Sequence, residues 1–243
     1  MKIPVEVCEY VIRKKFYRPM QVYIFLKVNC SGKIKKKELD YKIIAEALCL
    51  KSTRAVRNNL NILLKSNWMG YCKKSGYYYV RAFEKIRQMY GFYARTAAYF
   101  DGNEIHHMKA FIAAVKIAYL VNKQKRKKRA TERVQGRSIH IARSSSQYYP
   151  LANEAMAKVL EISISTAYQL KLLASNAGYI HIKKTFEEIN CGAGEANLFK
   201  RGLPELADKV ITNTGKIRLQ GIDMVMHFIK FSKRKKLETY KEG

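Results

Sequence analysis

The sequence predicts an α+β chain that is mainly helical, carries small β-hairpins, and contains two similar units in tandem. The segment at residues 44–56 (IAEALCLKSTRAV) is repeated at residues 156–168 (MAKVLEISISTAY). Each copy is followed by a Leu-Leu pair, a Ser-Asn pair, and a β-prone stretch that begins with Gly-Tyr. Apolar and aromatic residues make up 48% of the 243 positions, which excludes a disordered tail. The length allows one large or two small domains, and the repeat favours two units.

The charge of the chain indicates a polyanionic partner. Lys and Arg number 47 against 19 Asp and Glu, a net charge of +28 that exceeds what solubility requires. Nucleic acid and an anionic membrane surface both bind clustered cations favourably.

A membrane-spanning segment is not expected. The longest apolar run, residues 110–121, is interrupted by Lys116 and is too short to span a bilayer. The N-terminus lacks the apolar region of a secretory signal. We therefore predict no membrane insertion and a cytoplasmic protein that associates with the nucleoid.

The duplicated segment has the pattern of a helix-turn-helix. Aligned without a gap, the copies pair Leu48 with Leu160 and Val56 with Tyr168. Two helices that cross steeply need alanine where their backbones approach, leucine between them, and Ser or Thr to cap the second helix. The second copy resembles the helix-turn-helix of bacterial regulators and site-specific recombinases. A two-helix corner in an all-helical core uses the same residues, and this alternative stays open.

The residues around the first copy extend the pattern. A helix is expected from Pro19, a short strand from Lys33, and after the helix-turn-helix a hairpin whose turn is Lys73–Gly76. The order helix, strand, helix, helix, strand, strand resembles a winged-helix domain over residues 17–86, in which the hairpin is the wing.

The second unit matches this order more loosely. Its first helix is expected from Glu104, and a weak strand at residues 138–142 precedes its helix-turn-helix, but the second strand of its wing is poorly defined. We predict a helical connector before this unit and a basic C-terminal extension after it. The boundaries are residues 87–103 for the connector, 104–200 for the second winged-helix domain with a basic insertion at 123–143, and 201–243 for the extension.

The second helix of the first copy is a candidate recognition helix. Its polar residues form one stripe opposite Val56, Leu60 and Leu63, and the stripe contains no acid. Arg and Asn side chains bind guanine and adenine edges in the major groove of DNA, whereas a solvated helix face is the alternative. The predicted contacts are Lys51, Ser52, Arg54, Arg57, Asn58, Asn61 and Lys65.

The equivalent helix of the second copy carries shorter side chains, and only two of its polar residues have long reach. We expect it to position the protein on DNA, or to read methyl groups and shape, more than to read base edges. Its predicted contacts are Ser163, Ser165, Thr166, Gln169 and Lys171.

Clusters of cations outside the two helices are predicted to contact phosphates. Lys73 and Lys74 lie at the first hairpin tip, and Lys183 and Lys184 at the second. The densest run is predicted to extend a helix as a mobile arm along the DNA backbone, with nuclear localisation or RNA binding as alternatives. Its candidate residues are Lys125, Arg126, Lys127, Lys128 and Arg129.

No enzyme, metal site or cofactor is predicted. The five cysteines form no C-x-x-C pair and are expected to act as small apolar residues or inert thiols. His106 and His107 lie near two acids, but at an expected helix start, where acids cap the helix. A phosphate-binding loop of the G-x-x-x-x-G-K-[ST] type is absent from the sequence.

Two winged helices in tandem on a basic chain resemble plasmid and phage replication initiators, which bind repeated duplex sites. The resemblance implies sequence-specific binding of double-stranded DNA, with a homodimer or multimer forming on repeated sites. A transcriptional regulator of a mobile element has the same parts. A non-specific architectural or packaging protein is a further alternative, and so is an RNA-binding protein.

Overall fold

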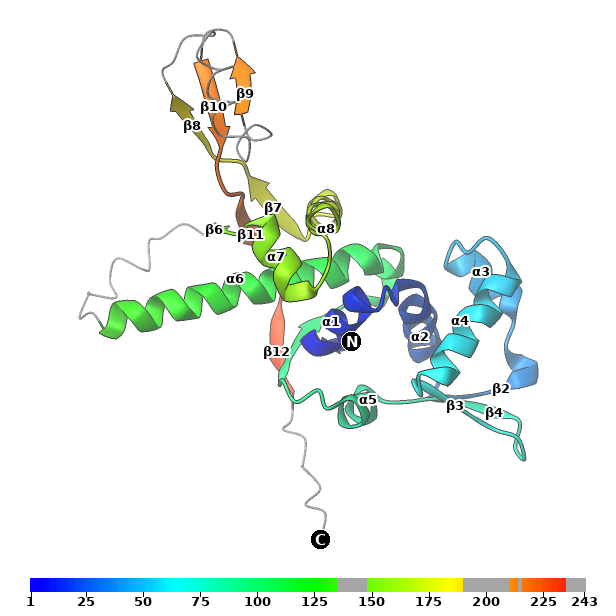
Figure 1. Ribbon diagram of the computed structural model, residues 1–243. Coiled ribbons are helices and arrows are strands. Elements are labelled where there is room, and N and C mark those ends of the chain that lie inside the picture. The colour runs from blue at the N-terminus through cyan, green and yellow to red at the C-terminus, as the bar shows by residue number, and fades with distance from the viewer. Residues whose placement is uncertain (135–147, 190–209, 214–215, 235–243) are drawn as a thin grey trace.

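The computed structural model describes residues 1–134, 148–189, 210–213 and 216–234 (Figure 1). The architecture is mixed α+β, as predicted: helices pack around small antiparallel sheets. Within the described residues there are four such sheets, each of three strands. One core cluster of buried apolar residues runs through both halves of the chain, from Ile3 to Ile229.

The first unit has the predicted order of elements over residues 17–86. Its sheet has the strand order β2-β4-β3, so that the strand after the hairpin turn lies in the middle. Trp68, which is fully buried, contacts the rings of Phe16 and Tyr23 at centroid distances of 5.0 and 5.1 Å. The elements are α2 (Tyr17–Asn29), β2 (Lys33–Lys35), η1 (Lys36–Glu38), α3 (Tyr41–Ala47), α4 (Thr53–Lys65), β3 (Met69–Cys72) and β4 (Tyr77–Val80).

Local side chains determine where these helices begin and end. The Asp40 carboxylate accepts hydrogen bonds from the backbone amides of Lys42 and Ile43 at the start of α3. The Ser52 hydroxyl does the same for the amide of Ala55 at the start of α4. After α4 the backbone turns at Asn67, whose φ of 57° is left-handed.

The second unit repeats this order. Its sheet has the order β6-β11-β7, in which the last of the three strands along the chain again lies in the middle. The strand predicted at residues 138–142 lies outside the described residues, and the strand that pairs in this sheet is Tyr149–Pro150. The elements are α6 (Met108–Val134), β6 (Tyr149–Pro150), α7 (Asn153–Leu160), α8 (Ile164–Asn176), β7 (Ile180–Lys183) and β11 (Met224–His227).

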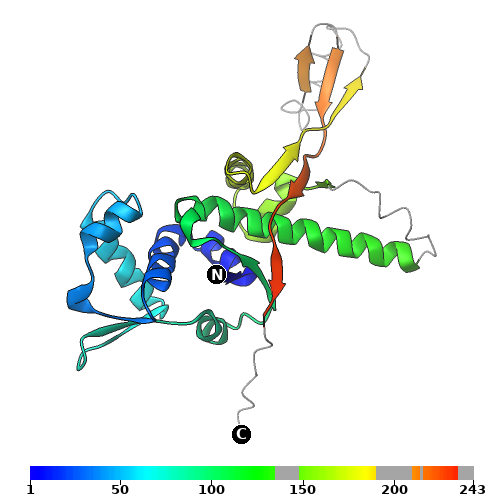
Figure 2. The ribbon, with the colours of Figure 1, turned by 180° about the vertical axis from the view of Figure 1, so that it is seen from behind.

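The predicted boundary at residue 200 is wrong, because β11 belongs to the second unit. β11 pairs with β7 along its full length, from Met224 opposite Lys183 to His227 opposite Ile180. Between β7 and β11 the chain forms a second sheet of order β8-β10-β9, which projects from the body (Figures 1 and 2). Its strands are β8 (Phe186–Ile189), β9 (Val210–Asn213) and β10 (Lys216–Gln220).

The predicted helical connector is wrong in part. Helix α5 (Phe83–Tyr90) ends at Gly91, and the chain then forms strand β5 (Thr96–Tyr99). A short 3-10 helix, η2 (Gly102–His107), leads into α6, and Asp101 caps it as predicted, by accepting a hydrogen bond from the amide of Asn103. The segment therefore adds a strand to a sheet as well as linking the units.

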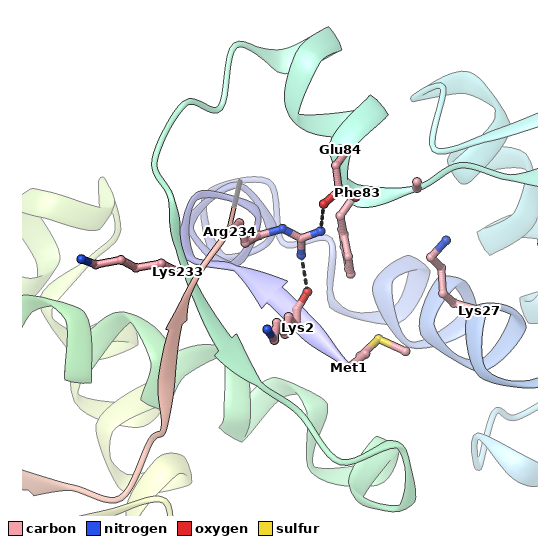
Figure 3. Close-up of a pocket in the computed structure, with 8 residues that line it drawn as sticks. Met1, Lys2, Lys27, Phe83, Glu84, Lys233 and Arg234 are labelled. Carbon is pink, nitrogen blue, oxygen red and sulfur yellow. Dashed lines mark hydrogen bonds and ion pairs between the residues drawn. The ribbon is translucent and has the colours of Figure 1, made fainter. Parts of the chain in front are cut away.

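Strand β5 is the middle of a sheet that holds both ends of the described chain. It pairs with β1 (Lys2–Pro4) on one side and β12 (Phe231–Lys233) on the other, and helix α1 (Val5–Arg13) follows β1 directly. Arg234, just after β12, donates a hydrogen bond to the carbonyl of Lys2 at 2.6 Å and pairs with Glu84 of α5 (Figure 3). Arg234 is thus used within the fold, whereas Lys233 is exposed.

Helix α6, the first helix of the second unit, also packs against α1 and α2. Residues 108–118 of this helix are buried on nearly every side, apart from Lys109, because α1 and α2 cover one face and α8 and β11 the other. Lys116, 2% exposed, pairs with Glu9 of α1 at 2.5 Å. The C-terminal half of α6 continues beyond the body (Figure 1).

We expect Ala114→Leu in the buried half of α6 to lower the free energy of unfolding by about 1–3 kcal/mol, because the added carbons have no space between α1 and α8. Ala114 is fully buried. Ala130 in the same helix is exposed, so Ala130→Leu is the matched control and should leave stability nearly unchanged. Chemical denaturation of both variants measures the difference. Equal stabilities would contradict the central position of α6.

Candidate nucleic-acid interface

The face of α4 that was predicted to contact DNA is exposed. Val56, Leu60 and Leu63 are buried on the opposite face, as expected from their spacing. Within the described residues, none of the cations on the exposed face is paired with a carboxylate. The exposed residues are Lys51, Ser52, Arg54, Arg57, Asn58, Asn61 and Lys65.

Arg57 is positioned by a neighbour that the sequence did not single out. Its guanidinium lies over the ring of Tyr41 in α3, 5.0 Å from the ring centroid. Stacking holds the planar group while leaving the N–H donors at its edge available, which suits bidentate binding to guanine or to phosphate. Tyr41 is therefore a candidate positioning residue of this interface.

The hairpin of the first unit carries more cations than predicted. Lys73 and Lys74 are exposed at its tip, where the amide of Gly76 donates a hydrogen bond to the carbonyl of Cys72 at 2.9 Å. Sheet pairing brings β2 beside this hairpin, and β2 together with the residue after it adds three lysines that sequence reasoning passed over. Their ammonium groups lie over tyrosine rings of the hairpin, with Lys33 and Lys35 on Tyr77, and Lys36 on Tyr71.

In the structure, the helix pairs α3–α4 and α7–α8 correspond residue by residue in a different register from the ungapped sequence alignment. Ser52 and Ser163 are both N-caps, and the hydroxyl of each accepts a hydrogen bond from the amide three residues later. Val56 therefore corresponds to Ala167, both fully buried, and not to Tyr168, which is 39% exposed. The turn before α8 is shorter than the turn before α4, so the second helices are offset by one residue.

The exposed face of α8 follows from this register. Ser163, Ser165, Thr166 and Gln169 are exposed, as predicted. Tyr168 occupies the position that corresponds to Arg57, and sequence reasoning missed it because the ungapped alignment pairs it with a core residue. An aromatic group at this position can contact thymine methyl groups but supplies no charge.

The prediction for Lys171 is wrong. Its side chain is 1% exposed, and its ammonium group donates hydrogen bonds to the carbonyl of Leu151 at 2.8 Å and to Asp223 at 2.9 Å. In the corrected register Lys171 corresponds to Leu60 of the first copy, which is a core position. Lys171 thus attaches the start of β11 to α8.

Lys183 and Lys184 are exposed, but not at a hairpin tip as predicted. Lys183 ends β7, and the chain continues into β8 and the projecting sheet. Thr185 holds this junction, since its carbonyl accepts a hydrogen bond from the amide of Gly221 and its hydroxyl donates one to the carbonyl of Ile222. The two lysines therefore lie at the base of the projecting sheet.

The basic run of α6 lies away from α4. Arg126 and Lys127 are exposed, whereas Lys125 is partly buried, with its ammonium group 4.7 Å from the ring centroid of Tyr149. The side chains of Lys128 and Arg129 lie outside the described residues. The 27-residue helix is about 40 Å long, and its basic end and α4 lie at opposite ends of the molecule (Figures 1 and 2).

Two cysteines in the described part of the chain differ in their surroundings. Burial raises the pKa of the Cys8 thiol to about 12, so this cysteine is a small core residue, as predicted. The sulfur of Cys49 lies 3.9 Å from Nδ1 of His106 at the surface. No three His, Cys, Asp or Glu side chains of the described residues gather where a metal ion could bind. Nor does this part of the chain contain a helix that is both long and apolar enough to cross a bilayer.

Comparison of the chain with protein-family models, with curated proteins and with solved structures gave no match.

Lys171→Ala should lower the free energy of unfolding by about 3–5 kcal/mol, because it leaves the Asp223 carboxylate without its buried cation. Lys158→Ala removes an exposed lysine of α7 and serves as the control. Thermal melting compares the two, and nucleic-acid binding is measured where both are folded. Loss of binding by Lys171→Ala without loss of stability would contradict the structural role.

Proposed function

We propose that the chain is a sequence-specific double-stranded DNA-binding protein that uses two winged-helix units. The units comprise α2 to β4 and α6 to β11. The order of elements and the matching sheet orders, β2-β4-β3 and β6-β11-β7, support this fold assignment for both. Exposed helices α4 and α8 occupy the recognition position of the helix-turn-helix in each unit.

The acid-free face of α4 carries the proposal. It presents Arg54, Arg57, Asn58 and Asn61 to solvent beside a lysine-rich hairpin. A face kept only for solubility commonly mixes both signs of charge, whereas this one offers donors that match base edges and cations that match phosphates. The chain has no catalytic role in this proposal.

Replication initiation of a plasmid, phage or other mobile element is the process we propose, on the resemblance of the tandem arrangement to such initiators. Transcriptional regulation of a mobile element uses the same modules. Non-specific coating of nucleic acid is the second candidate function, favoured by the net charge of +28 and by the basic end of α6. Binding to a defined DNA sequence distinguishes replication initiation and transcriptional regulation from non-specific coating.

Selection of bound fragments from random DNA, followed by binding measurements at several salt concentrations, tests the proposal. A sequence reader should bind the selected duplex about a thousand-fold or more tightly than random duplex. A coating protein would show equal affinities and only a steep dependence on salt. Preference for single strands or for RNA duplex would also contradict the proposal.

We expect Arg57→Ala and Lys73→Ala to change DNA binding in different ways. Loss of the Arg57 guanidinium should relax base preference at one position of the site, at a cost of about 1–3 kcal/mol for the preferred base. Loss of the Lys73 ammonium group should weaken binding to all sequences alike and reduce the salt slope by about one. Selected and mutated duplexes, titrated with both variants, give these values. Identical profiles would count against base reading by α4.

A further inference from the structure

A basic turn that sequence reasoning passed over lies opposite the recognition helix of the second unit. The turn joins α1 to α2, and together with the helix residues on either side it has the sequence Arg-Lys-Lys-Phe-Tyr-Arg over residues 13–18. Between this turn and α8 a groove opens with a volume of about 840 Å³. Arg13 and Lys15 line one side together with Lys109 of α6, and Ser165 and Gln169 of α8 line the other.

The groove has an excess of positive charge. Its one carboxylate among the lining residues, Glu161, pairs with Arg13 at 3.1 Å, and Arg13 also donates a hydrogen bond to the carbonyl of Val159 at 3.0 Å. These contacts fix α1 against the end of α7. Within the described residues, Lys15 and Lys109 form no ion pair, and both are exposed.

Backbone geometry and ring contact hold these two lysines at the edge of the groove. Lys15 has a left-handed φ of 53° directly after α1, so the chain reverses there and leaves the side chain at the surface. The ammonium group of Lys109 lies 5.3 Å from the ring centroid of Tyr17, which also lines the groove. Cations thus come from the α1–α2 turn and α6, and hydrogen-bonding groups from α8.

We propose that this groove receives one phosphodiester strand of the bound duplex. Lys15 and Lys109 neutralise its phosphates, while the Ser165 hydroxyl and the Gln169 amide donate hydrogen bonds to phosphate oxygens. This inference rests on the proposed function and assigns the second unit the task of holding the backbone, with base reading left mainly to α4. The α1–α2 wall beside α8 also limits how deeply α8 can enter a major groove.

The double variant Lys15→Ala/Lys109→Ala tests the inference. Each lost phosphate contact lowers the slope of log affinity against log salt concentration by about 0.9, so a decrease of about 1.8 is expected with the duplex selected by the wild-type protein. Base preference should not change, because the lost contacts are to phosphates. The matched control is Lys85→Ala/Lys233→Ala, which removes two exposed lysines of α5 and β12 and should keep the wild-type slope.

The outcomes separate the inference from the proposed function. Thermal melting first establishes that both double variants are folded like the wild type. A decrease in slope that is confined to Lys15→Ala/Lys109→Ala supports the groove. If the wild type binds its selected duplex and this variant keeps the full slope, the groove proposal is wrong while sequence-specific binding stands. If the wild type shows no preference for any duplex, the proposed function fails, and the groove proposal fails with it.

Discussion

Burial of residues 108–118 of α6 on nearly all sides is the constraint on which the rest of the structure depends. Three alanines in its first half, Ala113, Ala114 and Ala118, are fully buried and allow close approach of neighbouring helices. A lysine in such a helix needs a partner, because an unpaired buried charge is costly, and Glu9 of α1 provides it for Lys116. The buried part of α6 thereby joins the second unit to α1 and α2.

The consequence is that the two units form one body. Strands β1, β5 and β12 bring both ends of the described chain to the same sheet, and Arg234 joins that sheet to α5 through Glu84. The positions of α4 and α8 relative to each other are therefore set by packing, unlike those of modules on a flexible linker. A DNA partner would meet a preformed arrangement of recognition surfaces.

Within this arrangement the two copies have diverged in surface chemistry while keeping their framework. The buried positions and N-caps of α4 and α8 correspond one to one, yet α4 exposes Arg57 where α8 exposes Tyr168. The second hairpin is extended by a further sheet, and the first is surrounded by lysines and tyrosines. The proposed roles, base reading by the first unit and backbone contact by the second, rest on this difference in surface chemistry.

The sequence by itself determined the features that depend on local spacing. The stripe of α4, the cap at Ser52 and the Lys-Lys-Ser-Gly turn follow from helical period, side-chain hydrogen bonding and glycine at positive φ. Only the tertiary structure decided the rest. Because the turn before α8 is shorter than the turn before α4, Lys171 lies at a core position. Pairing of β7 with the distant β11 extends the second unit beyond the boundary predicted at residue 200. Contacts between residues far apart in the chain leave no periodic signal in the sequence. Only the folded protein therefore shows that the basic turn between α1 and α2 lies beside α8.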